Sequence, residues 1–389
     1  MHNSGMPGQS FVVPPRADWD RGPWNRRTFQ RVRELVPTAP VRRSSTPAAW
    51  SRALQDLGSV DFEIDGRRET VDGFLAASFT DGFCVVHRGK IIAEHYDNGM
   101  SEHTLHLVQS VSKSVTATAL GILAARGQVR VDVPVTHYLP ELAATAYRGA
   151  TVQQVLDMTS GVQWDETYTA LDSHCAQMDV ACGWKTTSDP TWPKSMWELL
   201  LTLRESRGPH GADFSYRSIE TDVLGFVLER AAGVRLAALV SKELWAPMGA
   251  EEDACYTVDP TGFACACGGF NATLRDLARF ASLYVSGGAS AGRQIVPASW
   301  IDNTRAGDTR LFRGSYQEVL PSGAYRNQFW VEDPVRRILL ARGVFGQLIY
   351  MDPAAEFVAV KVSSWPEFVD PDRTRTALAA IRAIRDALA

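Results

Sequence analysis

The stretch Val108-Gln-Ser-Val-Ser-Lys-Ser-Val115 (VQSVSKSV) places three serines around one lysine, at the start of a segment with helical apolar spacing. Residues three apart lie on one face of an α-helix, so Ser110 and Lys113 can meet, whereas Ser112 points about 100° away from Lys113. Ser110 is also the only serine in the chain that stands three residues before a lysine. We therefore predict that Lys113 interacts with Ser110 and not with Ser112.

This pair has the chemistry of a nucleophile and its base. A serine hydroxyl is a weak nucleophile, and an amine can accept its proton only if burial and neighbouring positive charge keep the amine neutral. The flanking residues are apolar, which predicts that Lys113 is buried, and a buried lysine without a role is unusual. If Ser110 opens the helix, the free N–H groups of the first turn face whatever oxygen the serine attacks. A solvated pair on a surface helix is the ordinary alternative.

Two further motifs strengthen the interpretation of this pair. Tyr216-x-Ser218 lies in a loop just before an amphipathic helical segment, and a phenol next to a lysine ammonium can carry a proton between nucleophile and leaving group. Late in the chain, Ala341-Arg-Gly343-Val344 falls inside a predicted strand, where a glycine marks the close approach of backbone to a ligand. Such a strand can present a backbone N–H to a developing oxyanion.

Together, these three motifs resemble the serine β-lactamase and penicillin-binding-protein superfamily, in the class C and esterase branch that uses a tyrosine. Within that branch the chain is most similar to the hydrolases of nylon oligomers (6-aminohexanoate oligomers), over roughly residues 80–370. The resemblance implies an acyl-enzyme mechanism: Ser110 attacks the carbonyl, Lys113 takes its proton and Tyr216 relays it to the leaving group. It also implies an oxyanion hole made of the N–H groups of Ser110 and Val344.

Two departures from the family pattern bear on the substrate. Ala341-Arg342-Gly343 stands where the family has Lys-Thr-Gly, so Arg342 either supplies the missing positive charge or points away. Ser218 replaces the asparagine of the second motif and thereby removes an amide that would contact a β-lactam side chain. Both departures disfavour β-lactamase activity and resemble the nylon-oligomer and esterase branch.

A long polar and aromatic segment, residues 163–192, is predicted to be a lid loop. By resemblance, Tyr168 contacts the region of the scissile bond, and Asp179 faces an ammonium end of the substrate, where a carboxylate is electrostatically sensible. A solvated loop acid remains the alternative for Asp179, and lid packing remains the alternative for Tyr168 and Trp184. The set of expected substrate-binding residues comprises Tyr168, Asp179, Trp184, Ser218, Cys267, Arg342 and Gly343.

The element pattern predicts an α+β fold of the β-lactamase and transpeptidase type. Strand signals around an Arg88-Gly89 turn return late in the chain as a three-strand meander, which indicates an antiparallel sheet built from both chain ends with flanking helices. We expect an N-terminal arm over the surface (1–22), a discontinuous sheet domain (23–109 and 270–389) and an inserted, mainly helical domain (110–269) that carries Ser110, Tyr216 and the lid.

Composition limits the partners. The chain has 389 residues and a formal net charge of −4, so it lacks the basic field that binding to a nucleic-acid backbone needs. No secretory signal or run of about 18 apolar residues is visible, which predicts a cytoplasmic protein without a membrane partner. Cys265-x-Cys267 is too short for the usual zinc knuckle, so we expect buried thiols, no metal and no cofactor.

The sequence leaves three functions open. The leading hypothesis is a serine hydrolase that cleaves amide or ester bonds of short linear small-molecule substrates. A carboxylesterase or D-amino-acid peptidase of the same superfamily is the alternative among enzymes. A catalytically silent binding protein is the alternative from another class, although the intact set of Ser110, Lys113 and Tyr216 argues against it. A homodimer is compatible with all three.

Overall fold

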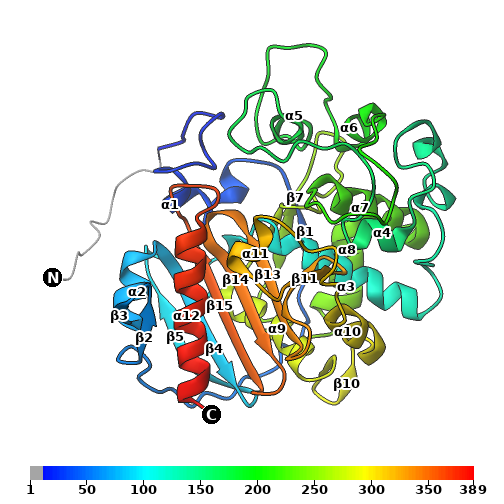
Figure 1. The fold of residues 1–389 in the computed structure, drawn as a ribbon. Coiled ribbons are helices and arrows are strands. Elements are labelled where there is room, and N and C mark those ends of the chain that lie inside the picture. Colours follow the sequence, from blue (N-terminus) through cyan, green and yellow to red (C-terminus); the bar gives the residue numbers. More distant parts are fainter. Residues whose placement is uncertain (1–11) are drawn as a thin grey trace.

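A seven-stranded antiparallel sheet dominates the computed structural model, which describes residues 12–389 (Figure 1). Its strand order is β11-β12-β13-β14-β15-β4-β5, so strands from both ends of the chain lie side by side as expected. The bounds are β11 Ala324–Arg326, β12 Phe329–Asp333, β13 Ile338–Gly343, β14 Gln347–Asp352, β15 Phe357–Ser363, β4 Thr80–His87 and β5 Lys90–Tyr96. The α+β fold class predicted from the sequence is confirmed.

Strand β4 joins the early strands of the sheet to the late ones, because it pairs with β15. It pairs with β15 in a register that joins His87 to Phe357 and Phe83 to Lys361, and it is buried along its whole length. The hairpin to β5 turns at Arg88 and Gly89, which have φ of 48° and 72°. Positive φ at both turn residues matches the twist of the flanking strands, which is why this dipeptide signals a hairpin.

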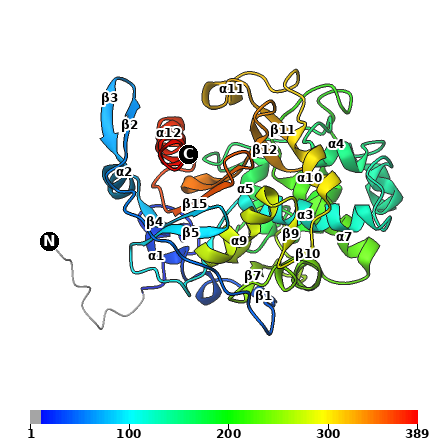
Figure 2. The ribbon, with the colours of Figure 1, turned by 90° about the horizontal axis from the view of Figure 1, so that it is seen from below.

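Helices cover both faces of the sheet (Figure 2). The C-terminal helix α12 (Pro371–Ala387) and α2 (Val71–Ala77) lie on one face, and α9 (Leu274–Val285) contacts β4, β14 and β15 on the other. This three-layer arrangement explains why β4 is apolar on both sides.

A smaller sheet, in the order β1-β7-β8-β6, supports the start of helix α3. Its pairs join Val41 to Ala254 and His106 to Ala272. β1 lies in the expected sheet domain and β7 in the expected helical domain, so this small sheet contains strands of both. The division at residues 109/110 and 269/270 remains a prediction. The bounds are β1 Thr38–Val41, β6 His106–Leu107, β7 Ala254–Thr257 and β8 Phe270–Ala272; two small hairpins are β2 Asp61–Ile64 with β3 Arg67–Thr70, and β9 Ala289–Ser290 with β10 Arg293–Gln294.

The inserted region between β6 and β7 is mainly helical, and its central helices are α3 and α7, which pack on each other. Thirteen of the fifteen residues of α3 are buried, so this helix runs through the core. The remaining helices are α1 Asn25–Thr28, α3 Val111–Ala125, α4 Val152–Leu156, α5 His174–Ala181, α6 Met196–Thr202, α7 Ile219–Ala232, α8 Leu236–Val240, α10 Ala298–Arg305 and α11 Tyr316–Val319.

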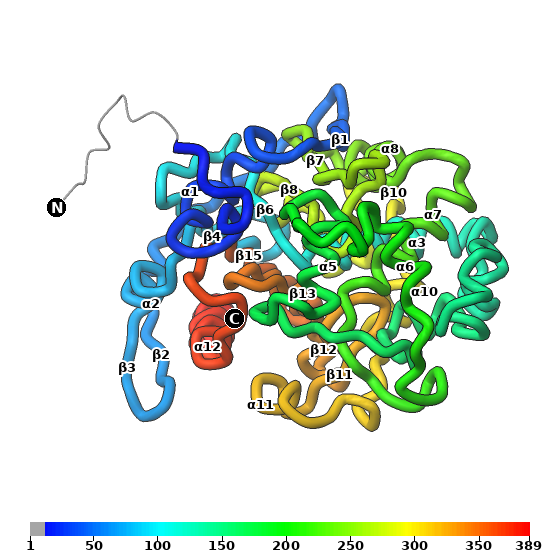
Figure 3. The backbone as a smooth tube through the Cα atoms, turned by 90° about the horizontal axis from the view of Figure 1, so that it is seen from above, coloured from blue at the N-terminus to red at the C-terminus, as the bar shows by residue number. Residues whose placement is uncertain are grey.

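The expected lid and arm differ from their predictions. The segment 163–192 contains the helix α5, which begins at the N-cap Ser173, so it is not wholly a loop. Residues 1–11, the first half of the expected arm, lie outside the described residues. The second half is partly buried: Trp19 is 1% exposed and packs edge-to-face on Trp184 of the lid at 5.3 Å. Burial of two indoles explains this docking. Figure 3 traces the backbone of this half in dark blue, next to α1.

Among residues 12–389 no helix combines the length and the apolar character that crossing a bilayer requires.

Candidate active site

Ser110 lies at the N-cap of α3, as the sequence predicted, and its side chain is free of any capping bond. The preceding residue, Gln109, has φ of +50°, a left-handed conformation that is uncommon outside glycine. The chain turns sharply at this residue after β6, and the turn places Ser110 at the start of α3. One turn further along, Lys113 Nζ donates to Ser110 Oγ at 2.9 Å.

Lys113 is 1% exposed and its ammonium group has three acceptors. Besides Ser110 Oγ, these are the Cys267 carbonyl at 2.7 Å and Ser218 Oγ at 3.2 Å. Burial lowers the pKa of Lys113, whereas Tyr216 and Cys267 in their ionised forms and the Glu166 carboxylate raise it, and the net pKa lies above its ordinary value. The three acceptors also match the three N–H donors of an ammonium group. The resting lysine is therefore an ammonium, not the neutral amine expected from the sequence.

Ser112 takes no part in this arrangement. Its hydroxyl donates to the Gln109 carbonyl at 2.5 Å and accepts from the Phe270 N–H at 2.9 Å. It therefore ties the start of α3 to β8, which is a structural role.

Tyr216 lies against the nucleophile within an aromatic group. Its ring stacks on Trp330 at 5.4 Å, its N–H donates to the Tyr316 hydroxyl at 3.1 Å, and Lys113 Nζ lies 5.2 Å from the centre of its ring. Burial raises the pKa of Tyr216, while Lys113 and Ser110 act to lower it. The net pKa lies above the ordinary value, so the phenol keeps its proton at rest.

Glu166 is a member of the site that sequence reasoning missed. Its carboxylate accepts from the Ser218 hydroxyl at 2.5 Å and from the Ser218 N–H at 2.8 Å, and thereby caps α7, whose N-cap is Ser218. The Tyr168 hydroxyl donates to it at 2.8 Å, and the Trp164 indole also donates to it. Ser218 thus connects the Lys113 ammonium to a carboxylate. Nothing in the sequence marked Glu166 except its place between two aromatic residues of the expected lid.

Strand β13 brings its last residue, Gly343, onto the backbone of the nucleophile. A Cβ added at Gly343 would stand 2.7 Å from the Val108 carbonyl oxygen and 3.0 Å from Ser110 N, which explains the glycine. Val344 follows, and neither its N–H nor the Ser110 N–H donates a hydrogen bond within the described part of the chain. Two free backbone donors therefore flank the Ser110 hydroxyl.

Two cavities meet at Ser110. The outer cavity has a volume of about 290 Å³ and is lined among others by Glu166, Tyr168, Tyr216, Trp330 and Arg342. The inner cavity has a volume of about 50 Å³, and the residues that line it include Asp20, Tyr168, Asp179, Trp184, Ser218, Cys265 and Cys267. A linear molecule held across Ser110 would extend into both.

Arg342 brings a positive charge to the outer cavity. Its guanidinium lies over the Trp330 ring at 4.9 Å and has no hydrogen-bond or ion-pair partner among residues 12–389. Burial lowers the pKa of Arg342 to about 10, so the side chain remains a cation near neutral pH. The side chain points toward the cavity, not away from it.

Acidic groups surround the far part of the inner cavity. Lys185 Nζ lies 2.7 Å from Asp179 Oδ2 and 3.2 Å from Asp20 Oδ2, so one cation serves two carboxylates. The other oxygen of Asp20 is buried without a hydrogen-bond partner. The pKa of Asp179 is raised to about 6, mainly by burial and also by the charge of Asp20, while Lys185 acts to lower it. Asp179 is therefore paired, which the sequence did not predict, and Asp20 is a second missed residue.

Every predicted residue lines one of the two cavities or contacts a residue that does. Trp184 is held in place because its indole donates to Thr257 Oγ1 at 3.0 Å. Cys267 is buried and contributes its carbonyl to Lys113. Tyr168 lines both cavities and stacks on Phe368 at 5.4 Å. A nucleophile, a buried ammonium, a proton-carrying phenol and two free N–H groups converge, which is the equipment for covalent acyl transfer.

Comparisons with known proteins point the same way. The family model described as Beta-lactamase matches residues 68–383. The 6-aminohexanoate-dimer hydrolase of Paenarthrobacter ureafaciens is 36% identical over 375 residues, which are 95% of this chain and 92% of that protein. Esterase EstB of Burkholderia gladioli is 32% identical over 57% of each chain. A solved structure from Bacillus anthracis, provisionally described as a 6-aminohexanoate-dimer hydrolase, has a TM-score of 0.87 and 27% identity over 96% of this chain and 97% of that one.

Proposed function

The chain belongs to the β-lactamase family of hydrolases, and from that premise we propose that it cleaves amide or ester bonds of short linear substrates through an acyl-enzyme on Ser110. The observation that carries the proposal is the 2.9 Å contact between Lys113 Nζ and Ser110 Oγ at the point where the two cavities meet. The intact set of Ser110, Lys113 and Tyr216 argues against a silent binding protein.

The proton of Ser110 leaves through Lys113. Because the resting lysine is an ammonium, it must first lose a proton, and Ser218 connects it to the Glu166 carboxylate by two hydrogen bonds. Transfer of one proton along this path leaves a neutral amine, which then takes the proton of Ser110 as the hydroxyl attacks the substrate carbonyl. This gives Ser218 and Glu166 a role in proton transfer in addition to the substrate-binding role expected for Ser218.

The tetrahedral intermediate is stabilised by the N–H groups of Ser110 and Val344, which have no other acceptor. Tyr216 delivers its proton to the leaving amine or alcohol and takes in its place the proton that Lys113 received from Ser110, because its phenol is protonated at rest and lies beside Lys113 and Ser110. Water then attacks the carbonyl carbon of the acyl-enzyme. The same groups move the protons in the opposite direction, so that Ser110 regains its hydroxyl proton and the acid product leaves.

The two cavities favour a substrate with opposite charges at its ends. In the inner cavity the carboxylates of Asp20 and Asp179 belong to the lining, whereas Lys185, which pairs with both, does not line it, so this cavity suits an ammonium end. In the outer cavity Arg342, which has no ion-pair partner among residues 12–389, offers a positive charge to a carboxylate end, beside the acids Glu166 and Glu318 of the same lining. The inner cavity, at about 50 Å³, is much smaller than the outer one and favours a narrow substrate end over a bicyclic nucleus. The linear dimer of 6-aminohexanoate has this shape and charge, in keeping with the relative from Paenarthrobacter.

A carboxylesterase is the second candidate, favoured by the 32% identity to esterase EstB. The catalytic residues would be the same, and only the tolerance for substrates without charged ends would differ. Both candidates act on a small molecule and need no nucleic acid, membrane or cofactor; a cytoplasmic location and a homodimer complete the proposal.

The test is release of 6-aminohexanoate from its linear dimer, run beside a p-nitrophenyl ester and a chromogenic cephalosporin, with Ser110→Ala as control. Cleavage of dimer and ester that is lost in Ser110→Ala supports the amidase. Cleavage of the ester alone makes the protein an esterase. If neither is cleaved by the intact protein, the hydrolase proposal is wrong and the binding protein takes its place.

A further inference from the structure

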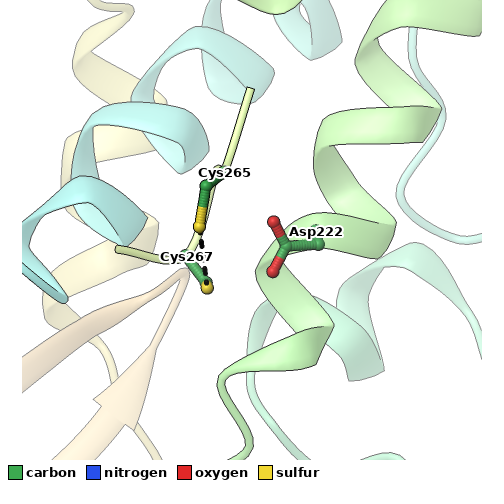
Figure 4. A group of neighbouring side chains, drawn as sticks. All are labelled: Asp222, Cys265 and Cys267. Atoms are coloured by element: carbon green, nitrogen blue, oxygen red, sulfur yellow. Dashed lines mark hydrogen bonds between the residues drawn. The ribbon is translucent and has the colours of Figure 1, made fainter. Parts of the chain in front are cut away.

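A second group of reactive side chains lies directly behind Lys113. Asp222 of α7 points its carboxylate toward the thiols of Cys265 and Cys267, which lie in the segment between β7 and β8 (Figure 4). One ligand atom from each of the three lies within 4.8 Å of the others, and all three residues are buried. The proposed catalytic mechanism uses only the Cys267 carbonyl from this group.

The spacing of the two thiols matches a tetrahedral metal ion. Their sulfur atoms are 3.8 Å apart. Two thiolates bound to one zinc ion at about 2.3 Å, with a tetrahedral angle between them, lie about 3.8 Å apart as well. The side chains therefore need little rearrangement to bind one ion together.

Asp222 supplies an independent indication. One of its oxygens accepts from the Ala266 N–H at 2.9 Å, whereas the other is fully buried and has no hydrogen-bond partner among residues 12–389. A buried carboxylate oxygen without a partner carries a desolvation cost that a bound cation would offset.

The cluster has access to solvent through the inner cavity. Cys265 and Cys267 line this cavity, and so do Cys182 and Met178; Cys267 Sγ lies 3.7 Å from Met178 Sδ. With Cys175, five sulfur-bearing residues line this cavity, and they favour a soft cation over Mg²⁺ or Ca²⁺, which prefer oxygen.

We propose that Asp222, Cys265 and Cys267 form a binding site for one thiophilic divalent cation, such as Zn²⁺ or Cd²⁺, with a fourth position open to the inner cavity. Binding releases the thiol protons, and the three anionic ligands leave the complex with one net negative charge. That charge is compatible with the adjacent ammonium of Lys113, whose nearest acceptor is the carbonyl of Cys267. An ion at this position narrows the inner cavity and constrains Cys267, so it inhibits the hydrolase.

The test uses cadmium chloride and the full-length protein, reduced beforehand and desalted. Binding is followed by the ultraviolet charge-transfer band of cadmium thiolate and by the amount of metal that stays bound to the protein after gel filtration. We expect one ion per chain, at least tenfold weaker binding in Cys265→Ser and in Asp222→Asn, and unchanged binding in Cys255→Ser. Cys255 is equally buried but lies on β7, with its sulfur beside Arg33.

Folding of each variant is checked by thermal unfolding without metal. If one of the two site variants does not fold, the other still tests the proposal. Inhibition of ester hydrolysis by Zn²⁺, reversed by a chelator and at least tenfold weaker in Cys265→Ser, would support the assignment. The proposal is wrong if the intact protein shows no charge-transfer band, or if Cys265→Ser and Asp222→Asn bind as tightly as the intact protein. It is also wrong if thiol titration of the unfolded protein shows that Cys265 and Cys267 are joined in a disulfide.

Discussion

Gly343 and Ser110 are in contact through their backbones. A Cβ on Gly343 would stand 3.0 Å from the nitrogen of Ser110 and 2.7 Å from the Val108 carbonyl oxygen, distances too short for a real side chain. Strand β13 therefore sets the position of the proposed oxyanion hole, because the next residue along it is Val344.

Gly343→Ala is expected to lower kcat for ester hydrolysis by about 10²–10³-fold, since the strand must move and one oxyanion donor moves with it. KM should change much less. Gly208→Ala is the matched control, because a Cβ there meets nothing within 4 Å. Equal rates in the two variants would contradict the oxyanion assignment.

Ser110→Ala should abolish labelling by a fluorophosphonate probe, whereas Ser112→Ala should keep it. Ser112 instead accepts the Phe270 N–H, and its loss leaves this buried donor unsatisfied. Ser112→Ala should therefore lower the free energy of unfolding by about 1–3 kcal/mol, measured by denaturant titration. Labelling that survives in Ser110→Ala would identify another nucleophile.

Glu166→Gln should slow acylation by about 10²–10⁴-fold, because the amide cannot take the proton that Lys113 passes through Ser218. The measurement is the burst phase with a p-nitrophenyl ester. Thermal unfolding serves as the check on structure, since Glu166 also caps α7. A folded variant that acylates within threefold of the intact protein would remove Glu166 from the proton path.

Asp20→Asn and Asp179→Asn should each raise KM about fivefold for substrates with an ammonium end and leave esters without one unaffected, which corresponds to about 1 kcal/mol of charge interaction. The pKa of Asp179 also predicts a pH effect. Below about pH 6 its carboxylate gains a proton, so KM for the ammonium substrate should rise as the pH falls through 6 in the intact protein. In Asp179→Asn this pH dependence should be absent; its persistence would contradict the assignment.

Lys361→Met should stabilise the protein at pH 6 by on the order of a few kcal/mol. Lys361 lies in the core of β15, with the Ser78 carbonyl at 3.3 Å and the rings of Phe74 and Trp365 beside it, and burial lowers its pKa from 10.5 to about 7. Between pH 7 and 10.5 the unfolded chain therefore holds more protons at this residue than the folded one, so the contribution of Lys361 to stability rises with pH.

The advantage of Lys361→Met should accordingly shrink as the pH rises from 7 to 10. Chemical denaturation at pH 6 and pH 9 measures both values. A difference between variant and intact protein that does not change with pH would mean that Lys361 titrates normally in the folded state.

Local signals in the sequence predicted much of this structure. The start of α3 at Ser110 and the turn at Arg88 and Gly89 depend on a few neighbouring residues, and both lie where they were expected. The sheet built from both chain ends also followed from strand patterns. The family resemblance is confirmed by the match over residues 68–383.

The residues that were missed depend on long-range partners for their place in the site. Glu166 is an ordinary acid in the sequence until folding places it on Ser218, 52 residues later. Asp20 belongs to a segment without periodicity, and it reaches Lys185 only because Trp19 packs on Trp184. The pairing of Asp179 with Lys185 spans only six residues, and it was not predicted because the segment was expected to be a loop, whereas it contains α5. Cys265-x-Cys267 gave no hint of Asp222 in α7.

The pairing of β4 with β15 has a consequence for synthesis. His87 leaves the ribosome about 270 residues before its partner Phe357, an interval of roughly 15–55 s at 5–20 residues per second. During that time the nascent chain carries Ser110 and Lys113 but not β15, so the edge of β4 that later pairs with β15 lacks its neighbour, while the other edge can already pair with β5. The growing chain thus needs shielding from aggregation, and hydrolysis begins only after the last strands have been released.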